Sequence, residues 1–223
     1  TGNFGNVFAG HAARKMGVPT RMLTVASNAN DILTRFFETG RMETQGVVPT
    51  HSPSMDIQVS SNFERLLFEL MDGDGHATAR EMQQFKQTGA FQLSQGQLAR
   101  ARTGFDGYRL DDPGTLEEVA RQSANTGMLI DPHSAIGLAA ARERRSDPHM
   151  PTIALATAHP AKFPDAVERA TGQRPPLPDR LADLYDRRER YTTLPNELAQ
   201  VQAFVRGISR RSGPDAAASR AGS

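Results

Sequence analysis

Apolar residues recur along the chain at the three- and four-residue spacing of helices that bury one face. Phe63, Leu66, Leu67 and Leu70 share such a face, and we expect them in the core. The same spacing predicts a last helix over 195–208 with five inward side chains: Leu198, Val201, Phe204, Val205 and Ile208. Further helices are predicted over 7–16, 32–39, 76–88, 94–103, 115–125, 133–144 and 164–171.

Helix limits follow from residues that satisfy free backbone groups at helix ends. A hydroxyl three residues before a glutamate predicts capping boxes at Ser61–Glu64 and Thr115–Glu118. Asp131 followed by Pro132 predicts the start of helix 133–144. Gly40 predicts the end of helix 32–39.

Short apolar runs predict strands over 21–26, 108–110 and 152–156. A loop, a helix and a strand follow one another at the start of the chain, which is half of a right-handed βαβ crossover. We therefore expect an α/β fold with a parallel sheet flanked by helices.

Between residues 43 and 125 a mainly helical part interrupts this βα rhythm. We predict four parts on that basis: the start of an α/β binding domain (1–42), a helical insert or subdomain (43–125), the remainder of the binding domain with the C-terminal helices (126–208), and a disordered tail (209–223). The tail is small, polar and poor in apolar residues.

Composition excludes several classes of protein. The 223 residues suffice for a sizeable core, and a formal net charge of +1 gives no reason to expect nucleic acid or an anionic membrane as a partner. There is no cysteine, and the six histidines show no metal-ligand spacing. We expect a cytoplasmic protein without a metal; the sequence defines no oligomeric state, and a monomer is compatible with it.

Two stretches carry candidate chemistry. Gly2, Asn3, Phe4, Gly5 and Asn6 form a glycine-rich turn that leads into the first helix, where free amides and the helix dipole favour an anion. The alternative is a simple tight turn. The second stretch, 156–163, follows the predicted strand 152–156, and ligands of α/β sheets collect beyond the carboxyl ends of strands.

A polar cluster follows strand 21–26 and comprises Asn28, Asn30, Asp31 and Arg35. An arginine fork beside amide donors is suited to a phosphate group. The alternative is local, with the Asn and Asp residues capping the next helix and Arg35 solvated.

Five blocks, in order, resemble threonine synthase in its longer fungal and bacterial form: TGNFGN (1–6), SNANDILTRFFETGR (27–41), SPSMDIQVSSNFERLLFEL (52–70), LIDPHSAIGLAAA (129–141) and ATAHPAKFPDAV (156–167). The resemblance implies a fold type II, tryptophan synthase β-like enzyme that depends on pyridoxal 5'-phosphate (PLP). That family converts O-phospho-L-homoserine and water into L-threonine and phosphate.

The resemblance also implies roles for individual residues. Residues Gly2–Asn6 would hold the PLP phosphate, and Thr157 would face the pyridine nitrogen. The polar cluster at Asn28, Asn30, Asp31 and Arg35 would take the substrate phosphate. For Thr157 the alternative is a threonine that ends a strand, and His133 and His159 are expected to be structural.

The family's Schiff-base lysine precedes an Asp and lies upstream of the phosphate loop. Lys15, Lys86 and Lys162 precede Met, Gln and Phe, so none matches. We therefore expect a C-terminal fragment whose N-terminal part is missing, with no catalytic residue of its own and no activity alone. Two alternatives stay open, a non-catalytic phosphate- or nucleotide-binding module and another type II PLP lyase such as a dehydratase.

Overall fold

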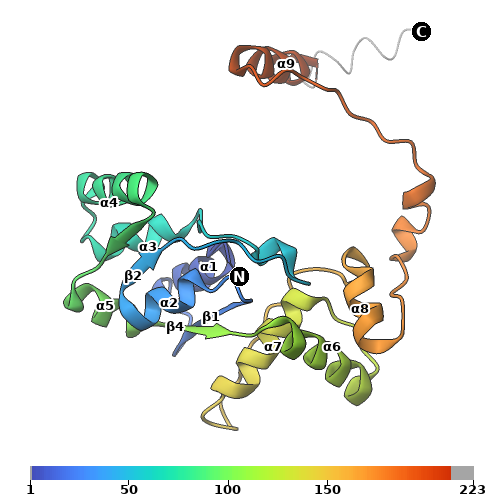
Figure 1. Ribbon diagram of the computed structural model, residues 1–223, viewed down its shortest axis with the longest axis horizontal. Helices are drawn as coiled ribbons and strands as arrows, with labels where there is room; N and C mark the ends of the chain where they lie inside the picture. The colour runs from blue at the N-terminus through green and yellow to red at the C-terminus, as the bar shows by residue number, and fades with distance from the viewer. Residues whose placement is uncertain (1, 212–223) are drawn as a thin grey trace. The chain divides into compact units, whose positions relative to one another are not determined.

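The computed structural model describes residues 2–211, with side chains up to residue 209 (Figure 1). It divides into two compact units, the first ending at Pro178 and the second beginning at Asp179. Each unit is described by itself.

The first unit alternates helices with short strands. Its helices are α1 (Gly5–Lys15), α2 (Ile32–Thr39), α3 (Phe63–Leu70), α4 (Gly75–Thr88), α5 (Gln95–Arg102), α6 (Asp112–Thr126), α7 (Pro132–Arg144) and α8 (Pro164–Thr171). Its strands are β1 (Leu23–Ser27), β2 (Arg41–Glu43), β3 (Ala90–Gln92) and β4 (Phe105–Arg109), and two 3-10 turns are η1 (Pro53–Met55) and η2 (Pro160–Lys162). The helices predicted in this unit are all present.

The predicted parallel sheet is present as the pair β1 and β4 (Figure 1). Leu23 is opposite Phe105 and Ser27 is opposite Arg109. Helix α2 packs on both strands, and the buried Val25 contributes to the core between them. The α/β prediction is therefore confirmed.

A second, antiparallel pair joins β2 to β3, with Met42 opposite Phe91. The sequence pattern did not predict a strand over 41–43. Three residues are too few to show an alternating pattern, and pairing is secured by the burial of Met42 and Phe91.

The strand predicted over 152–156 does not form. Ile153 is 83% exposed and Leu155 is 53% exposed, and the segment pairs with no strand among the described residues. An apolar run only becomes a strand when a neighbouring edge takes its hydrogen bonds. Residues 151–157 instead have no regular secondary structure.

Helix ends show which capping predictions were right. Asp131 caps α7 by accepting from the amides of His133 and Ser134, as predicted. Gly40 ends α2 in the left-handed conformation. The two predicted capping boxes were wrong: α6 begins earlier, capped by Asp111, and the N-cap of α3 is Asn62, without a side-chain cap bond.

The main core is a cluster of phenylalanines where α1, α2, α3 and β4 meet. Phe36 is fully buried and lies against Phe63, with ring centroids 4.6 Å apart, and against Phe91 at 6.3 Å. The apolar face predicted for α3 is buried here as expected. This core joins residues from before position 42 with residues from the predicted insert.

The second unit contains two 3-10 turns, η3 (Asp179–Leu181) and η4 (Leu184–Asp186), and the helix α9 (Leu198–Arg211). The five side chains predicted to point inward on α9 are exposed in this unit, because its described residues include no sheet or second α-helix to cover them. Helix α9 extends into the predicted tail, and residues 212–223 lie outside the described residues.

Truncation of Phe36 should strongly destabilise the protein. Phe36→Ala leaves a cavity among three aromatic neighbours and should lower the free energy of unfolding by about 3–5 kcal/mol. The matched control is Phe68→Ala on α3, because Phe68 is 44% exposed, and its cost should stay below ~1 kcal/mol. Denaturant unfolding measures both; equal losses would contradict the assignment of this core.

Candidate functional site

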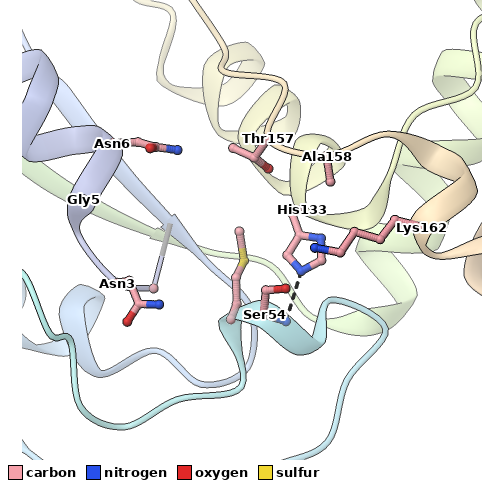
Figure 2. Close-up of a pocket in the computed structure, with 10 residues that line it drawn as sticks. Asn3, Gly5, Asn6, Ser54, His133, Thr157, Ala158 and Lys162 are labelled. Carbon is pink, nitrogen blue, oxygen red and sulfur yellow. Dashed lines mark hydrogen bonds between the residues drawn. The ribbon is translucent and has the colours of Figure 1, made fainter. Parts of the chain in front are cut away.

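A cavity of about 200 Å³ opens in the first unit. Segments far apart in the sequence line it: Gly2, Asn3, Gly5, Asn6, Ser54, Met55, His133, Thr157, Ala158 and Lys162. Figure 2 shows the residues of the N-terminal loop on one side and Thr157, Ala158 and Lys162 on the other. Four of the five predicted loop residues and Thr157 therefore meet at one site. The fifth, Phe4, does not line the cavity because its side chain is buried in the core, and Thr1 lies outside the described residues.

Phe4 determines how the loop enters helix α1. Its backbone is left-handed, with φ 61° and ψ −1°, and its ring is fully buried. The ring packs edge-on against Phe63 at 5.4 Å and lies 5.6 Å from Phe105. Core packing thus holds a backbone conformation that is unfavourable for a phenylalanine.

The first turn of α1 is arranged for an anion. The amide of Phe8 makes the first bond of the helix, to the carbonyl of Phe4 at 3.0 Å, so the amides of the residues before Phe8 precede the helix ladder. No side chain caps this end and no acidic residue lies in the first turn. The free amides and the helix dipole can therefore serve a phosphate.

The glycines serve close packing rather than a positive φ. Neither Gly2 nor Gly5 has a positive φ; that conformation falls on Phe4. A Cβ on Gly2 would lie 3.0 Å from Cδ1 of Ile57, and a Cβ on Gly5 would lie 3.4 Å from Nδ2 of Asn62.

Asn62 fastens the loop from the start of α3. Its backbone N–H and its Nδ2 both donate to the carbonyl of Asn3, at 3.3 and 2.9 Å. The hydroxyl of Ser61 donates to Oδ1 of Asn3 at 3.4 Å. The sequence pattern predicted Ser61 as a helix cap and so did not indicate this contact, although Ser61 and Asn62 lie in the resembling block 52–70.

A buried carboxylate, Asp131, does not itself line the cavity but holds His133 and Ser134 beside it. Its Oδ1 accepts from Nδ1 of His133 at 2.8 Å, and its Oδ2 accepts from the hydroxyl of Ser134. Burial alone would raise the pKa of Asp131, but hydrogen bonds from His133 and Ser134 outweigh it and lower the pKa below its usual value. Asp131 is therefore ionised at neutral pH.

His133 connects this carboxylate to the opposite wall. Its Nε2 accepts the backbone N–H of Ser54 at 3.2 Å (Figure 2), so the proton of the neutral ring is on Nδ1, facing Asp131. Both ring nitrogens are engaged. His159 instead caps η2 through its Nδ1.

The cavity carries positive charge. Among the described residues that line it none is acidic, and Lys162 is the lysine present. The Nζ of Lys162 lies 5.5 Å from the centre of the Phe163 ring, beside His133. Of the other lysines, Lys15 pairs with Glu69 at 3.0 Å away from the cavity.

Asn28 and Asn30, predicted to contact substrate, have their hydrogen bonds filled within the chain. Nδ2 of Asn28 donates to Oγ of Ser52 at 2.9 Å and to Oδ1 of Asp56 at 2.8 Å. Asn30 exchanges bonds with both backbone groups of Val48, at 2.8 and 2.9 Å. Both side chains hold the 46–56 loop and do not line the cavity.

Asp31 and Arg35 likewise pair with each other, at 2.9 Å. Arg35 also donates to the carbonyl of Glu43 at 3.0 Å, and Arg109 lies 3.4 Å from Asp31. The assignment of these four residues to a substrate phosphate stays a prediction, and their contacts do not add support to it.

Within residues 2–211 no cluster of His, Asp and Glu side chains could hold a metal ion. No helix in that range has the length and apolarity to cross a membrane.

Comparison with known proteins agrees with the five resembling blocks. The family model described as threonine synthase, C-terminal, matches residues 134–205. The threonine synthase of Pseudomonas aeruginosa is 50% identical over 215 residues, which cover 96% of this chain and 46% of that protein. The chain thus spans less than half the length of the curated relatives it matches.

Two solved structures share the fold. The PLP-bound threonine synthase from Brucella melitensis superposes with a TM-score of 0.85 at 50% identity, over 94% of this chain and 45% of that chain. Yeast threonine synthase gives a TM-score of 0.80 at 34% identity over the same shares. In sequence and in fold, the chain belongs to the threonine synthase family.

Proposed function

We propose that the cavity binds PLP and that the chain is part of a threonine synthase, which converts O-phospho-L-homoserine and water into L-threonine and phosphate. One observation carries the proposal: Gly2, Asn3, Gly5 and Asn6 of the loop and Thr157, predicted for opposite ends of the cofactor, line the same cavity. The PLP-bound relative from Brucella melitensis supports the choice of cofactor.

The residues present fit a phosphorylated pyridine. The uncapped first turn of α1 suits the phosphate, and the fastened carbonyl of Asn3 keeps the loop in place. Lys162 adds positive charge without any acidic residue among the described lining residues. Such a site favours dianionic groups, which both the cofactor and the proposed substrate carry.

PLP supplies an electron sink that stabilises negative charge at the carbons of a bound amino acid. The part of Thr157 would be to offer its hydroxyl to the pyridine nitrogen, which keeps that nitrogen unprotonated, whereas a carboxylate there would protonate it. Loop 2–6 would fix the cofactor's other end, and His133 and Ser54 would close the floor.

The proposal leaves the Schiff-base lysine outside the chain. Lys162 lines the cavity but lies on the short turn η2 beside the proposed partner of the pyridine nitrogen. The proposal also includes the division of the chain into four parts at residues 42, 125 and 208, and a cytoplasmic location for the protein.

The reaction itself can be tested on the complete gene product. With O-phospho-L-homoserine it should release L-threonine and phosphate in equal amounts, measured by amino-acid chromatography and phosphate assay. Equal amounts of phosphate and a keto acid, without threonine, would instead identify a dehydratase-like lyase. Binding of PLP without any product would leave a non-catalytic module.

Thr157→Val should retain the fold but lower the turnover rate by roughly 10–100-fold, since it removes one preorganised hydrogen bond worth about 1.5–3 kcal/mol. The change should also shift the absorbance spectrum of the bound cofactor. Thr157→Ser keeps the hydroxyl and is the matched control, expected to stay close to wild type. Full activity and an unchanged spectrum in Thr157→Val would exclude the proposed role of Thr157.

Gly2→Val should weaken cofactor binding. A branched side chain would press on Ile57, which lies 3.0 Å from the position of a Cβ, and displace the loop. We expect the dissociation constant of PLP to rise about tenfold, the effect of roughly 1.4 kcal/mol. Gly46→Val is the control, because a Cβ there meets nothing within 4 Å. Equal PLP affinity in the two variants would show that the loop does not hold the cofactor.

A further inference from the structure

Thr157 lies in a segment that regular secondary structure does not support. Residues 151–157 pair with no strand among the described residues. The backbone N–H of Thr157 donates to the hydroxyl oxygen of Ser134 at 3.1 Å. This bond, from the first turn of α7, links the Thr157 backbone to a rigid element.

The direction of the Ser134 hydroxyl is determined by its other partner. Ser134 lies in a short hydrogen bond with Oδ2 of Asp131, whose side chain is 0% exposed. An ionised carboxylate only accepts, so the single proton of Ser134 faces Asp131. The lone pairs of Ser134 are then directed to the N–H of Thr157, and reversal of the hydroxyl would leave both bonds unmade.

The second oxygen of Asp131 reaches the opposite wall. Oδ1 accepts from Nδ1 of His133 at 2.8 Å, and Nε2 of His133 accepts the N–H of Ser54 at 3.2 Å. One buried carboxylate thus connects two lining segments of the cavity, one through Ser134 and one through His133. Asp131 is difficult to replace, because the hydroxyl of Ser134 and the ring N–H of His133 each need one of its carboxylate oxygens as an acceptor.

Helix capping does not account for this arrangement. To cap α7, Asp131 only needs to accept the backbone amides of His133 and Ser134, which it does at 2.9 and 3.4 Å. The side-chain bonds to Ser134 and His133, and the onward bonds to Thr157 and Ser54, extend beyond the helix end.

We propose that Asp131 and Ser134 are positioning residues, which hold the hydroxyl of Thr157 at the cavity through the Thr157 backbone. The inference rests on the proposed role of Thr157 at the pyridine nitrogen. Asp131 and Ser134 act without touching the cofactor, as the groups that fix the geometry of the residue that does.

A double-mutant cycle of Ser134→Ala and Thr157→Val in the complete gene product tests this coupling. The readouts are the dissociation constant of PLP titrated into apoprotein, the cofactor absorbance spectrum and the free energy of unfolding. Ser134→Ala should weaken PLP binding about threefold to tenfold in the wild-type background, but less than about twofold when Thr157 is Val, because no hydroxyl then remains to be misplaced. Ser134→Thr, which keeps the hydroxyl, should restore binding.

Ser94→Ala is the stability control. Ser94 also caps a helix, α5, and its loss should destabilise the protein without changing PLP affinity. If Ser134→Ala does not fold, Asp131→Asn takes its place in the cycle, because an amide nitrogen facing Ser134 removes the acceptor of its proton.

Additive effects of Ser134→Ala and Thr157→Val on PLP affinity would overturn the inference while leaving Thr157 in its role. If the PLP dissociation constant and the cofactor spectrum of Thr157→Val equal those of the wild type, both the inference and the proposed role are overturned. If Ser94→Ala loses as much PLP affinity as Ser134→Ala, the inference is also overturned, since general destabilisation would then explain the weaker binding.

Discussion

The burial of Phe4 is the constraint on which the candidate site depends. Its ring belongs to the aromatic core shared by α1, α2, α3 and β4, and that packing compels a left-handed backbone at the residue before α1. The first helical turn, which no side chain caps, thereby comes to lie at the cavity through Gly5 and Asn6. Hydrophobic packing, which has no direction of its own, is converted into an oriented polar surface.

Sequence patterns predicted the elements well where apolar residues kept a helical spacing over several turns, or where a capping residue marked the end of a helix. Helix α2 was correct at both ends, because its apolar face and Gly40 agree, and α7 was correct in its cap because Asp131 precedes Pro132. Short elements failed for a physical reason: β2 has a partner strand whereas the segment 152–156 has none among the described residues, and that information is not local.

The candidate site was predicted unevenly for a similar reason. Motif and resemblance pointed to Gly2, Asn3, Gly5, Asn6 and Thr157, which line the cavity, and to Phe4, which does not; Ser54, His133 and Lys162 were not assigned to it. Their presence at the cavity follows from tertiary contacts such as the bond from Ser54 to His133. The polar cluster at Asn28 and Asn30 looked like a ligand site because amides that bind ligands and amides that bind loops are the same residue types.

The parallel pairing of β1 with β4 has a consequence for the order of folding. Four helices and the β2–β3 pair lie between these strands in the sequence, so their pairing closes a long loop at a high cost in chain entropy. The far wall of the cavity, with Thr157, comes later still along the chain. We therefore expect the cavity to form after the local helices, and recovery of PLP binding during refolding would report that these long-range contacts are complete.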